Sequence, residues 1–173
     1  AELLTIQVSG HLENVQLYEQ IRSNNNQMRA ILDSTRDSII LLDAQGRLID
    51  ANISAESLLN ISIEDYLYLD FAELIMSIAN SESQADIADK GLMRLARDLR
   101  LQSQNINRHA FQLRVGGQIH YIESVGSPVM ESPNDMMGRL LTLRDVTEER
   151  RLAEWREEVS HMLVHDLREP LSS

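Results

Sequence analysis

SIILLDAQGRLIDAN, at residues 38–52, carries the clearest structural signal in this 173-residue sequence. Residues 38–43 form an apolar run rich in strand-forming side chains, and residues 44–46 have the composition of a turn. Residues 47–50 supply a second strand-forming run, so the two runs together predict a β-hairpin. Asn52 follows directly, and its short polar side chain is a favoured N-cap for a helix.

Downstream of the hairpin the hydrophobic pattern changes between helix and strand periods. Asp70 and Glu73 form a capping-box pattern, and Leu92, Leu95 and Leu99 repeat at helical spacing. The expected helices are residues 53–60, 71–78 and 85–101. The expected strands are residues 108–115, 118–129 and 139–146, with a turn at Gly116-Gly117 and a loop at 131–135. This order predicts an α+β fold in which helices cover one face of a five-stranded antiparallel sheet.

Long helices of the coiled-coil type are expected at both ends of the chain. Residues 1–35 contain no proline and repeat apolar side chains at spacings of three and four, with a weak point at the polar residues 23–26. The tail has an apolar seam with a/d spacing, formed by Leu152, Trp155, Val159 and Met162. A seam this short needs a partner helix, so we expect a homodimer through the flanking helices. The chain therefore divides into a linker helix at 1–35, an α+β domain at 36–146 and a helical segment at 147–173.

The composition limits the classes of partner. Lys and Arg number 16 and Asp and Glu number 27, and the resulting net charge of −11 repels phosphate backbones and anionic lipid. Neither nucleic acid nor a membrane surface is expected as a partner, and no apolar run is long enough for a membrane segment in this fragment. The absence of cysteine excludes disulfides, thiolate metal sites and cysteine nucleophiles, and it fits a cytoplasmic protein.

The middle of the chain resembles a PAS domain. The resemblance rests on the stretch at 38–52, on the order of the expected elements, and on LTLRDVTEER at 141–150. In the last of these, Asp-Val-Thr at 145–147 is similar to the Asp-Ile-Thr exit motif of PAS sensors. The resemblance covers about 110 residues and implies a five-stranded sensor domain.

The exit motif predicts a coupling site between the sheet and the C-terminal helix. Asp145 ends the last expected strand and Thr147 begins the helix, so the Asp145 carboxylate is expected near the helix-start amides. We expect an arginine as its second partner. Arg150 is the better candidate, because Arg144 is adjacent to Asp145 on the strand and points to the opposite face.

The tail resembles a second family more sharply. VSHMLVHDLREPLSS at 159–173 is similar to the H-box of sensor histidine kinases, the first helix of their dimerisation and histidine-phosphotransfer domain. The segment at 3–21 resembles, more weakly, the last helix of a GAF domain leading into a linker. Together the three resemblances imply a fragment of a multi-sensor histidine kinase of a two-component system.

The kinase resemblance assigns roles to particular residues. It implies that His165 is the phosphoacceptor and that Asp166 assists as an acid or base. The parent would take the phosphoryl group from ATP and magnesium held by its own ATP-binding domain, and pass it to the receiver domain of a response regulator. Glu169 stands where many members have Thr or Asn, so the resemblance does not extend to phosphatase activity. Pro170 removes a helical hydrogen-bond donor and should bend the helix after the histidine.

Other readings of these residues remain open. Adjacent residues do not face each other on a helix, so Asp166 can equally be an ordinary solvated acid. His161 and His165 have the spacing of two metal ligands, but Met162 stands where the zinc-hydrolase motif needs Glu, and no metal site is expected. No cofactor is expected in this fragment either. A cysteinyl-flavin adduct is excluded, and the helix expected at 85–101 offers no axial histidine for haem.

Two histidines on expected strands, His109 and His120, have surface or sheet-packing roles in this interpretation. Two alternatives to the kinase fragment also stand. One is a PAS ligand-sensing module joined to a different output, and the other is a structural dimerisation module. Phosphorylation of His165 separates the kinase fragment from the first alternative. A monomer in sedimentation would remove the second alternative and weaken the kinase reading.

Overall fold

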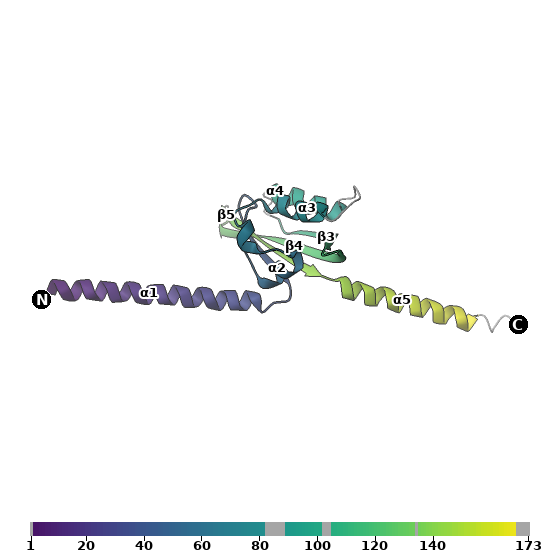
Figure 1. Cartoon of the computed structure of the whole chain (residues 1–173), viewed down its shortest axis with the longest axis horizontal. Coiled ribbons are helices and arrows are strands. Elements are labelled where there is room, and N and C mark those ends of the chain that lie inside the picture. Colours follow the sequence, from purple (N-terminus) through teal and green to yellow (C-terminus); the bar gives the residue numbers. More distant parts are fainter. Residues whose placement is uncertain (1, 82–88, 102–104, 134, 169–173) are drawn as a thin grey trace. The chain divides into compact units, whose positions relative to one another are not determined.

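The larger part of the molecule is built on one antiparallel sheet of five strands (Figure 1). The strands are β1 (Ser38–Asp43), β2 (Leu48–Ala51), β3 (Asn107–Val115), β4 (Gln118–Ser132) and β5 (Asp135–Asp145). Their order across the sheet is β2-β1-β5-β4-β3, and every neighbouring pair is antiparallel. The predicted α+β class and five-stranded sheet are therefore confirmed.

The structure, a computed structural model, describes residues 2–81, 89–101, 105–133 and 135–168. Within these ranges, side chains are described from residue 16 to residue 162, residue 81 excepted. The chain divides into two compact units, Ala1–Arg36 and Asp37–Ser173.

The predicted first hairpin is confirmed, and Asn52 fastens it to the helix that follows. The Asn52 Oδ1 atom accepts hydrogen bonds from the backbone N–H of Ala55, at 3.1 Å, and of Ile39, at 2.9 Å. One side chain therefore caps α2 (Ile53–Leu59) and binds the first strand. A short 3-10 helix, η1 (Ile63–Tyr66), follows.

Two longer helices complete the domain, and their starts are set by aspartates. Asp70 accepts a hydrogen bond from the Glu73 N–H at 3.0 Å as α3 (Phe71–Ser81) begins. Asp89 accepts one from the Gly91 N–H at 2.7 Å at the start of α4 (Lys90–Arg100). The predicted start at residue 85 is wrong, because Asp89 is not helical and caps the helix instead. Residues 82–88 lie outside the described part.

The turns between the last strands differ in how well the sequence predicts them. Gly116 and Gly117 both have positive φ, 58° and 77°, as a two-residue hairpin turn requires, so this turn is confirmed. The predicted loop at 131–135 is wrong. The strand β4 continues to Ser132, which pairs with Asp135, and two register shifts after Val129 absorb the mismatch between the strands.

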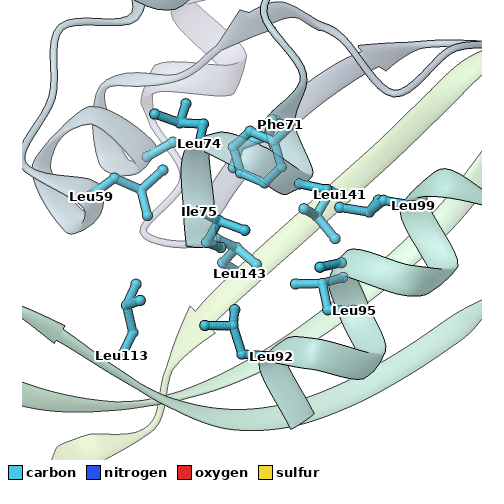
Figure 2. Packing of buried hydrophobic residues seen from close by; sticks show 14 of the residues in the cluster. Leu59, Phe71, Leu74, Ile75, Leu92, Leu95, Leu99, Leu113, Leu141 and Leu143 are labelled. Atoms are coloured by element: carbon cyan, nitrogen blue, oxygen red, sulfur yellow. The ribbon is translucent and has the colours of Figure 1, made fainter. Parts of the chain in front are cut away.

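The core lies between one face of the sheet and the helices α2, α3 and α4 (Figure 2). Alternate residues of β1 and β5 face it, because successive side chains on a strand point to opposite faces. The largest fully buried side chains are Ile40, Leu42, Leu48, Leu59, Phe71, Ile75, Leu92, Leu95, Leu113, Ile122, Leu141 and Leu143. The predicted inward leucines of α4, Leu92, Leu95 and Leu99, are thus all buried. The helices cover the apolar face of the sheet.

The terminal helices are α1 (Glu2–Asp33) and α5 (Thr147–Arg168). The helix α1 is continuous through residues 23–26, so the expected weak point does not interrupt it. Large apolar side chains are exposed on both helices, at Leu17, Tyr18, Ile21, Met28, Ile31, Leu152, Trp155 and Met162. Among the described residues, no helix combines the length and the apolar character needed to cross a membrane.

Candidate functional site

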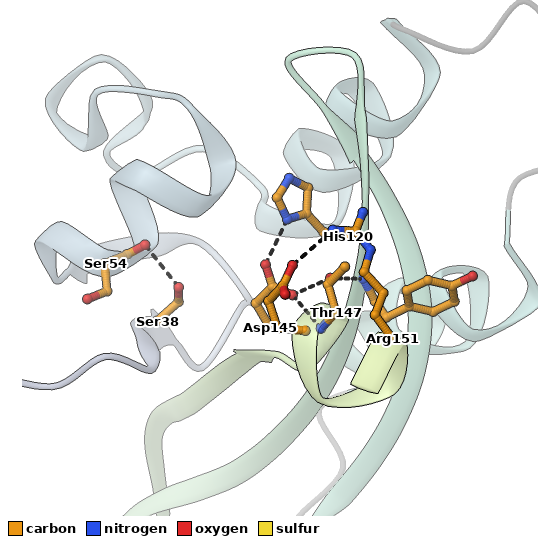
Figure 3. A network of polar contacts seen from close by, with 8 residues as sticks. Ser38, Ser54, His120, Asp145, Thr147 and Arg151 are labelled. Carbon is orange, nitrogen blue, oxygen red and sulfur yellow. Dashed lines mark hydrogen bonds and ion pairs between the residues drawn. The ribbon is translucent and has the colours of Figure 1, made fainter. Parts of the chain in front are cut away.

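The candidate site lies where β5 ends and α5 begins, next to the start of β4 (Figure 3). Five residues with connected contacts define it, and we call them the junction cluster: His120, Tyr121, Asp145, Thr147 and Arg150. Two come from β4, one from the end of β5 and two from the first turn of α5. The cluster therefore connects the sheet with the helix that leads toward His165.

The Asp145 carboxylate is the centre of the cluster. Its Oδ1 atom accepts a hydrogen bond from the Thr147 N–H at 2.9 Å, and a second, short one from the Thr147 hydroxyl. Its Oδ2 atom lies 2.7 Å from Nδ1 of His120. The first N–H groups of a helix have no hydrogen-bond acceptor within the helix, and the Asp145 carboxylate accepts from one of them. The helix dipole also favours a negative charge at this end of α5.

Thr147 and Arg150 attach the first turn of α5 to β4. The Thr147 hydroxyl accepts a hydrogen bond from the Tyr121 N–H at 2.9 Å, and Thr147 is only 6% exposed. The Tyr121 carbonyl accepts a hydrogen bond from the Val146 N–H, also at 2.9 Å. The Arg150 guanidinium lies over the Tyr121 ring, 5.0 Å from its centre, a cation–π geometry. The helix start is thus held by backbone, hydroxyl and ring contacts together.

The structure brings Asp145 and Thr147 together as the sequence predicted, but the expected arginine partner is wrong. The second partner of Asp145 is His120. Arg150 lies over Tyr121 instead, and Arg144 pairs with Glu149 on α5 at 3.4 Å.

His120 is the residue that sequence reasoning missed. Ile122 pairs with Asp145 across β4 and β5, so His120 lies two residues along β4 on the same face as Asp145. The pairing register of β4 with β5 is the only information that places His120 beside Asp145. Local sequence patterns do not fix the register of β4 on β5, so the sequence alone did not place His120 beside Asp145.

The electrostatics of Asp145 favour the ionised form. Burial raises the pKa of Asp145, but the hydrogen bonds from Thr147 and His120, with the charge of His120, outweigh burial and lower that pKa below its usual range. A carboxylate with a lowered folded-state pKa contributes stability that is present above the unfolded pKa and is lost as pH falls through the folded pKa.

We therefore expect Asp145→Asn to destabilise the domain at neutral pH by about 1 kcal/mol, because a helix-start carboxylate is lost. The difference between variant and wild type should shrink as the pH falls below the usual carboxyl range, since the wild-type Asp145 is then protonated as well. Urea unfolding at a series of pH values measures both effects. Asp65→Asn, an exposed aspartate on η1, is the matched control. A pH-independent cost would assign Asp145 a purely steric role.

The predicted phosphotransfer residues lie near the end of α5. His165 and Asp166 belong to the helix, and their side chains lie outside the described part of the structure. Glu169 and the bend expected at Pro170 also lie outside the described residues. His161 is exposed one helical turn before His165.

A second polar cluster lies inside the domain, beneath α4. Asp98 Oδ2 is 3.1 Å from His109 Nε2, although the two are not aligned as a hydrogen bond. Arg139 of β5 is 4% exposed, and burial lowers its pKa while the negative charge of Asp98 opposes that change. The Arg139 side chain packs against Gly126, where a Cβ atom would lie 3.4 Å from the Arg139 Nη1 atom. The packing role expected for His109 fits this position, and the cluster fastens α4 to β3 and β5.

A small cleft lies beside the junction cluster. It has a volume of about 110 Å³ and is lined by Tyr121, Val146 and Arg150 together with Asp89 and Gln112. Within the described ranges, no three His, Cys, Asp or Glu side chains are grouped so as to hold a metal ion.

The comparison with known families agrees with this architecture. Residues 26–146 match the PAS family, described as the PAS fold. The chain belongs to the PAS family. Two solved PAS domains share the fold. The PAS domain of BvgS from Bordetella pertussis has a TM-score of 0.57 and 14% identity, and the match covers 81% of this chain and 98% of that chain. The PAS domain of an HTR-like protein from Haloarcula marismortui has a TM-score of 0.52 and 16% identity, and the match covers 75% of this chain and 98% of that chain.

Two curated proteins contain a similar PAS region. The chain is 25% identical over 154 residues to the alginate biosynthesis sensor protein KinB of Pseudomonas aeruginosa, covering 89% of this chain and 24% of KinB. It is 28% identical over 161 residues to the nitrogen regulation protein NtrY of Azorhizobium caulinodans, covering 89% of this chain and 18% of NtrY. The chain thus spans less than a quarter of either relative. The PAS domain is consistent with a sensory module.

Proposed function

We propose that this chain is the sensory and dimerisation fragment of a two-component sensor histidine kinase, in which a PAS domain controls a phosphoacceptor, His165, through α5. The observation that supports this most directly is the continuity of α5 from Thr147 to Arg168. His165 lies 18 residues after Thr147 on the same helix, about 27 Å along its axis. A change in the contacts between the sheet and the start of α5 would therefore rotate or tilt the segment that carries His165.

The proposed chemistry is phosphoryl transfer to an imidazole nitrogen. The nitrogen lone pair of His165 attacks the γ-phosphorus of ATP, the new N–P bond forms as the bond to the β–γ bridging oxygen breaks, and ADP leaves. Asp166 would accept or orient the proton on the other ring nitrogen. Magnesium and ATP are brought by an ATP-binding domain of the parent, and an aspartate of a response regulator then receives the phosphoryl group.

A homodimer completes the proposal. Trp155 and Met162 are seven residues apart on α5 and both are exposed in the single chain, and Leu152 is exposed with them. Apolar side chains at this spacing are stabilised when two helices pair along them. The expected location of such a kinase output is the cytoplasm, where ATP and the response regulator are found.

An insertion series in the full parent kinase tests whether α5 carries the signal. One residue inserted between Thr147 and Leu152 turns everything downstream by about 100°, whereas seven residues nearly restore the facing and lengthen the helix by about 10 Å. We expect autophosphorylation to lose its control after one or two inserted residues and to recover it after seven. A steady decline with length would show that α5 is only a tether, and a wild-type parent that takes up no phosphate from ATP would overturn the kinase assignment.

A further inference from the structure

We propose that His120 is a positioning residue for α5, and that its protonation tightens the attachment of the helix start to the sheet. The anchoring of α5 would then strengthen as the pH falls through the neutral range, where imidazole side chains change charge. This inference deepens the proposed function by giving its coupling site a means of regulation. It is tested on the helix start itself, so it does not depend on kinase activity.

The geometry places His120 where its proton matters. Its Nδ1 atom lies 2.7 Å from Asp145 Oδ2, while the other carboxylate oxygen is bound by Thr147. Figure 3 shows this chain of contacts from His120 through Asp145 to Thr147. The side chains of His120 and Asp145 are 25% and 36% exposed, so water can deliver and remove the proton. The carboxylate that holds the helix start is therefore shared with a titratable ring.

The two protonation states of the ring hold the carboxylate differently. A protonated imidazole donates a charge-assisted hydrogen bond from Nδ1, about twice as strong as a neutral one. A neutral imidazole can donate from Nδ1 only in one of its two tautomers, and in the other its lone pair faces the carboxylate. Since hydrogen bonds lower the pKa of Asp145, this carboxylate stays negative through the neutral range. The carboxylate is thus held most firmly when the His120 ring carries a proton on both nitrogens.

The other charged groups at the junction belong to residue types that do not titrate in this range. On α5, Glu148 pairs with Arg151 at 2.9 Å, and Arg150 lies over Tyr121. Between β5 and α5, Arg144 pairs with Glu149. On β3, the residue opposite His120 is the apolar Leu113. Arginine and glutamate side chains keep their charge through the neutral range as a class, so a pH response at this junction points to the histidine.

Amide hydrogen exchange at the helix start of the 173-residue chain is the direct measurement. The N–H groups of Val146, Thr147 and Arg150 each donate a hydrogen bond at the junction and serve as probes. After correction for the intrinsic pH dependence of exchange, we expect their protection to be roughly threefold higher near pH 5.8 than near pH 7.8, a small factor because the pair is partly exposed.

Matched variants separate His120 from other causes of a pH response. His120→Gln should remove the response, and His120→Lys, which keeps a positive charge, should give the same protection at both pH values. His161→Gln removes an exposed histidine elsewhere on α5 and should keep the wild-type response. A wild-type chain without the response, or an unchanged response in His120→Gln, overturns the proposal. If His120→Gln loses its fold by circular dichroism, the same comparison is made with Asp145→Asn, which should also abolish the response.

Discussion

Changing His165 to glutamine is expected to reduce phosphate uptake by the chain to background. Glutamine keeps a polar side chain of similar reach, but its amide nitrogen has no available lone pair to attack the γ-phosphorus of ATP. The chain would be incubated with ATP, magnesium and the separately purified ATP-binding domain of the parent kinase. Acid-labile phosphate on the chain is then measured.

Two controls accompany the His165→Gln variant. Circular dichroism and sedimentation should match the wild type, because a single substitution near the end of α5 leaves the PAS core untouched. His161→Gln, one helical turn earlier, should keep full labelling. Phosphate retained by His165→Gln, or label found on His161 in that variant, would remove the phosphoacceptor assignment. Loss of labelling in both variants would point to damage to the helix instead.

Gly91→Ala is expected to destabilise the PAS domain by about 2–4 kcal/mol, although it lies in a helix. In most helices this substitution stabilises by up to about 1 kcal/mol, because alanine is the better helix former. Here a Cβ at Gly91 would lie 2.0 Å from the Ala110 carbonyl oxygen, a backbone atom of the edge strand β3. The strand or the start of α4 must move, and the Asp89 contacts with Gly91 and Gln112 would be strained with it.

Urea unfolding gives the free energy for the Gly91→Ala variant. Met93→Ala is the matched control in the same helix. Met93 is 54% exposed and alanine is also a good helix former, so its effect should stay within about 0.5 kcal/mol. If Gly91→Ala unfolds at the wild-type urea concentration, the close approach of α4 to β3 is not required for stability, and the cap at Asp89 alone positions the helix.

Much of the fold could be predicted from local pattern. The hairpin at 38–52, the cap at Asn52 and the turn at Gly116-Gly117 each depend on residues that are neighbours in sequence. Capping by Asp70 was equally local, because a carboxylate reaches an amide three residues away without help from the rest of the chain.

Two of the errors concern where a predicted element ends or begins. The polar composition of residues 131–135 predicts a loop, but Glu131 and Ser132 continue β4 and Asp135 begins β5. The start of α4 was placed too early because apolar periodicity extends beyond the helix, whereas Asp89 turns its side chain back to cap it and to accept a hydrogen bond from Gln112 on β3. In the second case a contact between segments far apart in sequence, Asp89 with Gln112, overrides the local signal.

The sequence by itself determined the kinds of element, their order and the pairing of Asp145 with Thr147, because periodicity, turn residues and caps act over a few residues. Only the tertiary structure decided that His120 faces Asp145 and that Asp98 lies between His109 and Arg139. Those partners come from different strands and helices. Their meeting depends on the register of β4 against β5 and on the packing of α4 on the sheet, and neither is encoded in any short segment.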